Sequence, residues 1–281
     1  MVDSLWLIAN VRSINYVLHT NNRIFEKQST SWSNHGHMKQ MRYKKQKRAK
    51  KGGTNFWDRE YKEGGGHLAL SLEPSEDLEA FTRWLERRSG KSQLNVTCSV
   101  TDLGCGNGRN LIYLAAQYGM HGVGFDVSKE AVSQAEKTVG KDYQLAFEAR
   151  SIAGAFPSIQ DKSQTIVLDM MTSHFLLKAE REVLRKEVAR ILKPGGWYFL
   201  KTFLLDGDLN ASRLLKENPA EETGSYIHPL IGVPEHVFTI PELEDDLFEY
   251  FEVVKINKSH RHIKDGKAHK RRNVSLYCKR R

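Results

Sequence analysis

The sequence has few cysteines and no long apolar segment. Its 281 residues include three cysteines, Cys98, Cys105 and Cys278, and no two of them are spaced as a CxxC pair. We therefore expect neither a disulfide framework nor a structural zinc site, and no bound metal. No apolar run reaches the roughly eighteen residues that a membrane-spanning helix needs. These absences are typical of a cytoplasmic protein, and a hydrophobic content of 40% is enough to build a substantial core.

Acidic residues are scarce in two stretches, so the net charge of +9 is unevenly distributed. Residues 39–51 carry eight basic residues and no acid, and residues 255–281 carry eleven basic residues against Asp265 alone. The body of the chain between them must therefore be acidic. Basic flanks of this kind are usually solvated, but they also suit a phosphate backbone, so RNA stays open as a partner.

The first 38 residues lack sustained apolar periodicity and an apolar segment of the secretory-signal type. With only two acids, Asp3 and Glu26, they fit an organelle transit peptide, and an overextended start before Met38 or Met41 fits as well. We predict that residues 1–54 form a disordered basic extension and that the folded domain covers residues 55–281.

From residue 55 onward, strand-like and helix-like segments alternate, which predicts an α/β fold with a parallel sheet covered by helices. Apolar runs such as "TIVLDM" are typical of strands buried at the centre of a sheet. The expected strands are 96–103, 122–126, 144–150, 165–170, 197–203, 251–256 and 273–278, and the expected helices are 74–88, 109–117, 129–139, 178–192 and 241–248.

The segment "TDLGCGNGRN", residues 101–110, places three glycines between a predicted strand and a predicted helix. Such a turn lets a ligand approach backbone N–H groups at the start of the helix. The dinucleotide pattern GxGxxG, counted from Gly104, would need glycine at Arg109. Asp126 ends the second strand, where its carboxylate can accept hydrogen bonds from both hydroxyls of an adenosine ribose. Because that acid would serve NAD as well as an S-adenosyl cofactor, the loop spacing has to discriminate between them.

Asp102, followed by Gly104, Gly106 and Gly108, has the acid-x-GxGxG form, which resembles motif I of class I S-adenosylmethionine-dependent methyltransferases. The strings "VLDMM" and "ILKPGGWYFL" are similar to later motifs of the same superfamily. More narrowly, "LGCGNGRNLIYLAAQYGMHGVGFDVS" and "FWDREYKEGG" resemble the tellurite-resistance methyltransferases, a branch related in fold to the thiopurine methyltransferases. The resemblance implies S-adenosylmethionine as the cofactor. It also implies a Rossmann-like, seven-stranded, mostly parallel sheet with helices on both faces and an antiparallel last strand.

The resemblance further implies which residues bind this cofactor. Asp102 and the glycine loop would hold the methionine end, Asp126 the ribose, and Val127 and Ile152 the adenine faces. Ser151 stands where the family often places an acid for the adenine amino group. The full predicted set is Trp57, Tyr61, Asp102, Gly104, Cys105, Gly106, Asn107, Gly108, Asn110, Asp126, Val127, Ser151, Ile152, Asp169 and Met170.

Methyl transfer from a sulfonium needs alignment of donor and acceptor more than a reactive side chain, so no catalytic residue is required. Two candidates for such a role are Asp169 and His174. Asp169 would orient the acceptor or cap a helix, and His174 would act as a general base or only line the site. Trp57 and Tyr61 either close over the cofactor or anchor the N-terminal segment. Residues 204–238 form a long insert that we expect to cover the acceptor.

The predicted function is methylation of a small molecule, a soft nucleophile such as a metalloid oxyanion or a thiol. An RNA methyltransferase that uses the basic flanks is the first alternative, although the fourth strand carries "DMMT" and no NPPY-type tetrapeptide. A non-catalytic scaffold that binds S-adenosylmethionine is the second. The sequence leaves the oligomeric state open.

Overall fold

The computed structural model describes residues 53–64, 71–260, 262–264 and 267–281. The predicted basic extension therefore lies outside the described residues, apart from its last two positions. The same holds for the transit-peptide and start-site alternatives and for the charge run at residues 39–51. The expected domain boundary at residue 55 falls inside the first helix, α1 (Gly53–Lys62), which the sequence analysis did not predict.

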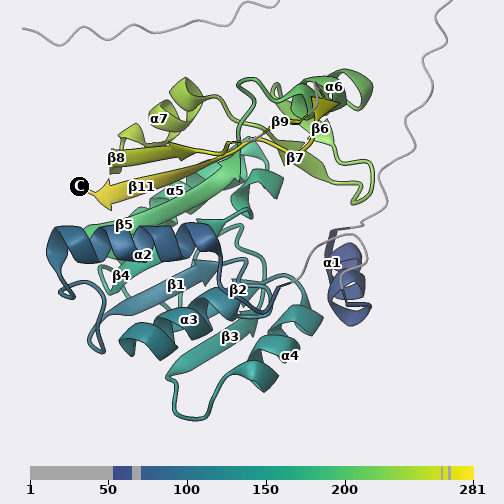
Figure 1. The fold of residues 1–281 in the computed structure, drawn as a ribbon. Coiled ribbons are helices and arrows are strands. Elements are labelled where there is room, and N and C mark those ends of the chain that lie inside the picture. The colour runs from purple at the N-terminus through teal and green to yellow at the C-terminus, as the bar shows by residue number, and fades with distance from the viewer. Residues whose placement is uncertain (1–52, 65–70, 261, 265–266) are drawn as a thin grey trace, which may run out of the picture. The chain divides into compact units, whose positions relative to one another are not determined.

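A seven-stranded sheet forms the centre of the domain, in the order β3-β2-β1-β4-β5-β11-β8 (Figure 1). The first five of these strands run parallel, and β11 is antiparallel to both of its neighbours. This confirms the predicted fold class. The strands are β1 (Ser99–Leu103), β2 (His121–Asp126), β3 (Leu145–Ala149), β4 (Gln164–Met170), β5 (Leu192–Phe203), β8 (Phe251–Lys258) and β11 (Asn273–Arg280).

Helices cover both faces of the sheet, and each face has its own apolar cluster (Figure 1). Along β4, Ile166 and Leu168 belong to one cluster and Val167 to the other, because successive side chains of a strand point to opposite faces. A strand that is buried on both faces reads as a continuous apolar run, which explains the pattern seen in the sequence. The covering helices are α2 (Glu76–Ser89), α3 (Arg109–Tyr118), α4 (Lys129–Thr138), α5 (Lys178–Ile191) and α7 (Ile240–Phe248).

The predicted elements differ from the observed ones mainly at their ends. The first strand was expected to start at residue 96 but starts at Ser99, because Asn95 organises a turn in front of it. Its side-chain oxygen accepts the Thr97 N–H at 2.9 Å, and its carbonyl accepts the Cys98 N–H at 3.0 Å. Conversely, β5 begins at Leu192 and includes the "KPGG" segment that was expected to be a turn.

The insert at residues 204–238 folds into elements of its own. It contains α6 (Leu209–Glu217) and a hairpin of β6 (Ser225–Ile227) and β7 (Pro234–His236). Asp208 caps α6 by accepting the Ala211 N–H at 3.0 Å. The insert also supplies all the fully buried members of a third apolar cluster, Ala211, Tyr226 and Val237. The insert is therefore a small packed subdomain, and the sequence analysis predicted neither its helix nor its hairpin.

The remaining short elements are the 3-10 helix η1 (Ser173–Phe175) after β4 and the two-residue strands β9 (Ile263–Lys264) and β10 (Lys267–Ala268). Within the described segments, no helix has the length and apolar character needed to cross a membrane.

Candidate functional site

A cavity of about 620 Å³ opens at the carboxyl ends of the parallel strands. Its walls come from the segments that follow β1, β2, β3 and β4, from the end of β5, from α1, and from the β6–β7 hairpin. Open α/β sheets bind ligands at this edge, where the strand order reverses. The volume suits a drug-sized ligand, for which cavities of roughly 300–1,000 Å³ are usual.

The glycine loop after β1 forms one wall, and two of its glycines have no room for a side chain. Gly104 has φ +79°, and a Cβ there would overlap the Thr172 side chain and lie 2.8 Å from Thr172 Cβ. Gly106 has φ +55°, and a Cβ there would meet the Tyr61 hydroxyl. Glycine is therefore required at both positions, for its backbone conformation and for the close approach of other groups.

Asp126, at the end of β2, ties this loop to the neighbouring strand. One carboxylate oxygen accepts the Gly106 N–H and the other accepts the Ser128 N–H, each at 2.9 Å. Burial raises the pKa of Asp126 above its usual value, while these two hydrogen bonds oppose the shift. Because each carboxylate oxygen has two lone pairs, Asp126 can still accept bonds from two ligand hydroxyls at the cavity wall.

Asp102 lies beneath the loop and is 1% exposed. Its Oδ2 atom is buried and has no hydrogen-bond partner among the described residues. Burial, and next the nearby carboxylate of Asp126, raise the pKa of Asp102 to about 7. A buried oxygen without a donor is rare in folded proteins and calls for an explanation. A bound cation, such as a ligand ammonium group, would satisfy it.

Helix α1 closes the loop side of the cavity and is fastened to α4. Asp58 accepts the Ser128 hydroxyl at 2.7 Å, and Gln134 donates to the Tyr61 carbonyl at 2.7 Å. Burial raises the pKa of Tyr61 far above its usual value, so its hydroxyl over Gly106 stays protonated. Trp57 packs edge-on against Phe175 with ring centroids 5.5 Å apart. Both Trp57 and Tyr61 line the cavity, and the contacts of α1 with α4 are those expected of an anchored N-terminal segment.

The structure directs Asp169 away from this cavity, which it does not line. The side chain is fully buried and accepts the Ser173 N–H at 3.0 Å, the Tyr198 hydroxyl at 2.7 Å and an Arg185 N–H at 3.3 Å. The candidate role of Asp169 as an acceptor-orienting or cofactor-binding residue is therefore corrected. Its carboxylate fixes the start of η1, which corresponds to the capping alternative.

His174 does line the cavity, between Phe175 and Phe203, whose ring centroids lie 4.3 Å and 5.1 Å from the imidazole. Its Nδ1 atom is buried and has no partner in the described part of the chain. Burial, and next the charge of Arg271, lower the pKa of His174 to about 3. The imidazole is therefore neutral at pH 7. A group this weakly basic is poorly matched to proton abstraction, which favours the lining role.

Most of the predicted cofactor-binding set meets at this cavity. Asp102, Gly108 and Asp169 do not line it, whereas Trp57, Tyr61, Gly104, Cys105, Gly106, Asn107, Asn110, Asp126, Val127, Ser151, Ile152 and Met170 do. The opposite wall was not predicted from the sequence; it includes Phe175, Leu176, Lys201, Phe203, His228, Leu230, Ile231, Val233 and Glu235. The only signal for that wall was the length of the insert.

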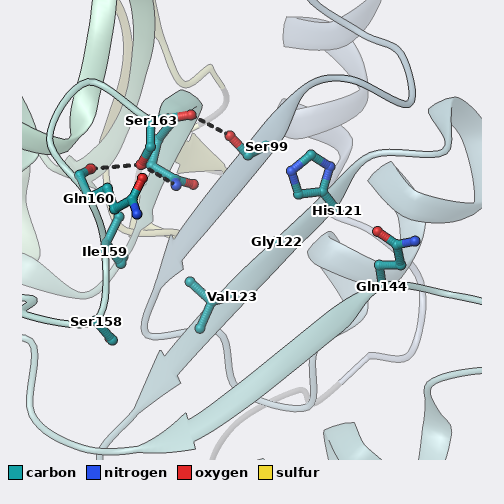
Figure 2. A pocket seen from close by; sticks show the side chains of 10 residues that line it. Ser99, His121, Gly122, Val123, Gln144, Ser158, Ile159, Gln160 and Ser163 are labelled. Atoms are coloured by element: carbon teal, nitrogen blue, oxygen red, sulfur yellow. Dashed lines mark hydrogen bonds between the residues drawn. The ribbon is translucent and has the colours of Figure 1, made fainter.

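A second pocket of about 480 Å³ lies at the opposite, amino-terminal edge of the sheet (Figure 2). Polar groups line it, and some of them satisfy one another. Ser99 donates to the Ser163 carbonyl at 2.7 Å, and Ser163 donates to the Gln160 carbonyl at 2.7 Å (Figure 2). This pocket contains none of the predicted site residues, so we place the functional site at the carboxyl edge.

Comparisons with known proteins identify the kind of domain that carries this cavity. Residues 100–196 match the family model for a methyltransferase domain. The chain is similar to the glycine/sarcosine/dimethylglycine N-methyltransferase of Actinopolyspora halophila, with 28% identity over 131 residues that cover 46% of this chain and 23% of that protein. It is also similar to the 27-O-demethylrifamycin SV methyltransferase of Amycolatopsis mediterranei, with 30% identity over 131 residues that cover 45% of this chain and 46% of that protein.

Among solved structures, a SAM-dependent methyltransferase from Methanosarcina mazei matches with a TM-score of 0.56 at 24% identity, over 67% of this chain and 94% of that chain. At this identity the likeness concerns the fold. The chain spans less than half the length of the two curated relatives, and the acceptors in their names differ. The prediction of a methyltransferase domain is confirmed by the family model, and the solved structure agrees with the predicted fold.

Proposed function

Because residues 100–196 match the family model for a methyltransferase domain, we propose that the chain is a class I S-adenosylmethionine-dependent methyltransferase that methylates a small organic acceptor. The observation that carries the proposal is one cavity that joins the glycine loop and Asp126 to an apolar wall provided by the insert. Residues 204–238 are in this proposal the acceptor-covering insert.

The residues beside the loop fit the cofactor. Asp102 does not line the cavity, but its unsatisfied Oδ2 lies beneath the glycine loop, and in this proposal it receives the ammonium group of the cofactor's amino-acid end once the cofactor is bound. The side-chain-free backbone at Gly104 and Gly106 gives close access to that end. Asp126 would receive the ribose hydroxyls, and Val127 and Ile152 would flank the adenine. S-adenosylmethionine supplies a methyl group that is already activated by its sulfonium.

The chain's own contribution is to position the acceptor and keep water out. Alignment of this kind can lower a reaction barrier by about 7–11 kcal/mol. The aromatic side chains Trp57, Phe175 and Phe203 supply apolar surface around the cavity. Because His174 is neutral and weakly basic, we propose that the acceptor reacts as a nucleophile that has already lost its proton or needs none.

The walls of the cavity favour an organic acceptor over a metalloid oxyanion. An oxyanion acceptor would need a free cation, yet the two cations on the insert side of the cavity are already paired, and Arg109 lines the cavity beside the glycine loop, at the proposed cofactor end. Lys201 pairs with Asp77, and Arg271 pairs with Asp208 at 3.0 Å and with Glu235 at 3.2 Å. Of the acceptors suggested by the tellurite-resistance and thiopurine branch, we therefore propose the organic, thiol-like class.

Replacing Asp126 tests the cofactor end. We expect Asp126→Ala to weaken S-adenosylhomocysteine binding by roughly ten- to a hundredfold, since hydrogen bonds to a charged group contribute about 1.5–3 kcal/mol. Calorimetry measures this directly. The control is Glu148→Ala, which removes an exposed acid from the adjacent strand β3. Equal affinity in folded Asp126→Ala and Glu148→Ala proteins would show that the ribose binds elsewhere.

Removing the basic flank tests the acceptor class. A chain that starts at Gly52 lacks residues 39–51 but keeps all the described residues, so its turnover of a small acceptor should stay within about threefold of the full chain. A screen with labelled S-adenosylmethionine against thiols, tellurite and tRNA measures this. A hundredfold loss of turnover, together with RNA binding by the full chain that weakens steeply with salt, would favour the RNA alternative.

A further inference from the structure

The hairpin wall of the cavity contains two polar side chains, the buried Glu235 and the half-buried His228, that the methyl-transfer chemistry does not use. Glu235 lies on β7 and is 2% exposed, and His228 follows β6 at the tip of the same hairpin. Both side chains line the cavity beside Leu230, Ile231 and Val233. A polar pair in an apolar wall is the usual arrangement for fixing a ligand's orientation.

Only one of the two carboxylate oxygens of Glu235 accepts hydrogen bonds from the described residues. Oε1 accepts hydrogen bonds from the Tyr226 hydroxyl and from Arg271 Nη1, the latter at 3.2 Å. No hydrogen bond to Oε2 is found among the described residues, and His228 Nε2 lies 3.9 Å from it. That separation is too long for a hydrogen bond, so Oε2 of this cavity-lining residue is left as an acceptor for a ligand or a water molecule.

The protonation of His228 follows from its backbone contacts. Its Nδ1 atom accepts the N–H groups of Leu230 at 3.3 Å and Ile231 at 3.2 Å, so in the neutral ring the proton is on Nε2. Burial lowers the pKa of His228 below its usual value, and the neighbouring Glu235 only partly opposes this. At the cavity the pair thus offers one donor, His228 Nε2–H, and one acceptor, Glu235 Oε2.

The surrounding charges disfavour a cationic ligand at this pair. Arg271 compensates the charge of Glu235 and stacks on Phe203, with its guanidinium carbon 4.1 Å from the ring centroid. An ammonium group placed beside Glu235 would therefore also be close to Arg271. A hydroxyl group carries no charge and both donates and accepts a hydrogen bond, so it matches the donor and the acceptor together.

We propose that Glu235 and His228 form a recognition site for a hydroxyl group on an apolar, ring-bearing acceptor. The acceptor's hydroxyl donates to Glu235 Oε2 and accepts from His228 Nε2–H, while its apolar body lies against Leu230, Ile231 and Phe203. The site sets which acceptors bind and how they are oriented, and it needs no proton transfer. This inference rests on the proposed function, because it identifies the hairpin wall as the acceptor end of the cavity.

Three probes of matched shape test the proposal: 2-(hydroxymethyl)naphthalene, its methyl ether and 2-(aminomethyl)naphthalene, which is cationic at pH 7.5. Calorimetry with the full chain, with and without S-adenosylhomocysteine, gives their affinities. We expect the alcohol to bind at least tenfold more tightly than the ether and the amine. Equal binding of the three probes, binding of none of them, or a preference for the amine would overturn the proposal.

Two variants locate the preference in the pair. In His228→Asn the side-chain oxygen can replace Nδ1 as acceptor for the Leu230 and Ile231 N–H groups, but the Nε2–H donor is lost. We expect its alcohol preference to fall below about threefold, and Glu235→Gln, which lowers the charge at the same site, to reduce the preference as well. The control is His121→Asn, a histidine in the second pocket (Figure 2), which should keep the full preference.

Failure of this inference can be told apart from failure of the proposed function. An unchanged alcohol preference in folded His228→Asn protein would contradict the recognition site. It would not affect the proposal that the cavity binds the cofactor. Conversely, a chain that prefers the alcohol through this pair but does not bind S-adenosylhomocysteine would keep the recognition site and contradict the methyl-transfer proposal. If Glu235→Gln fails to fold because Arg271 loses its partner, His228→Asn alone decides the outcome.

Discussion

Asp102→Asn should weaken S-adenosylhomocysteine binding by ten- to a hundredfold and, at the same time, stabilise the protein measured without this ligand at pH 8. The loss of affinity follows from removing the charged partner of the methionine ammonium group, a bond to a charged group worth about 1.5–3 kcal/mol. The gain in stability follows because the ionised carboxylate is 1% exposed and its Oδ2 has no partner among the described residues.

The pH dependence of the free energy of unfolding gives the sign of this effect. The pKa of Asp102 is about 7 in the folded chain, against an ordinary value of 3.8. The folded state therefore binds the proton more tightly, and stability falls as pH rises from about 4 to about 7. Because one pKa unit corresponds to about 1.4 kcal/mol, the cost at pH 8 is on the order of a few kcal/mol.

Denaturant unfolding at pH 5 and pH 8, with and without S-adenosylhomocysteine, checks both the loss of ligand affinity and the gain in stability of Asp102→Asn. Wild-type protein without ligand should lose more stability between the two pH values than Asp102→Asn protein, and the ligand should stabilise the wild type much more. A variant that is less stable than the wild type at pH 8, yet binds the ligand equally well, would mean that Asp102 has a structural role only.

Gly104→Ala should abolish measurable S-adenosylhomocysteine binding, with a loss of more than about a hundredfold. Two effects combine at this position. Alanine is strained at φ +79°, which costs roughly 1–2 kcal/mol for a non-glycine residue. In addition, its Cβ would overlap the Thr172 side chain, so the loop or the segment after β4 must move. Either movement displaces the backbone that faces the cofactor.

Gly64→Ala is the matched control for backbone strain. Gly64 has φ +78°, nearly the same as Gly104, but no heavy atom lies within 4 Å of the Cβ position. The Gly64→Ala substitution should therefore introduce about the same backbone strain without displacing the glycine loop. The affinity of this variant for S-adenosylhomocysteine should stay within about threefold of the wild type. If the two variants bind the ligand equally, the contact between the loop and Thr172 is irrelevant to the cofactor site.

The parts of this site that the sequence predicted are encoded locally. The loop glycines, Asp102 and Asp126 lie within one strand–loop–helix–strand unit. They meet at one edge of the sheet because the carboxyl ends of parallel strands share that edge. The continuous apolar runs of β4 and β5 likewise predicted buried central strands, whose burial on both faces the structure explains.

The parts that were missed or wrong depend on contacts between distant residues. Asp169 lies at the end of β4 as expected, but the direction of its side chain is set by hydrogen bonds to Tyr198 and Arg185, which no local pattern connects to it. The recognition pair depends on Arg271, more than 30 residues after Glu235 in the sequence, to neutralise the carboxylate. The short strands of the hairpin carry no alternation long enough to predict them.

The central claim is that the cavity at the carboxyl edge of the sheet binds S-adenosylmethionine for methyl transfer. Calorimetric titration of the full chain with S-adenosylhomocysteine, and separately with NAD, tests it most directly. We predict one binding event with S-adenosylhomocysteine that disappears in Gly104→Ala, and no binding of NAD, because Arg109 stands where a dinucleotide loop needs glycine. Tight binding of NAD with no response to S-adenosylhomocysteine would contradict the claim.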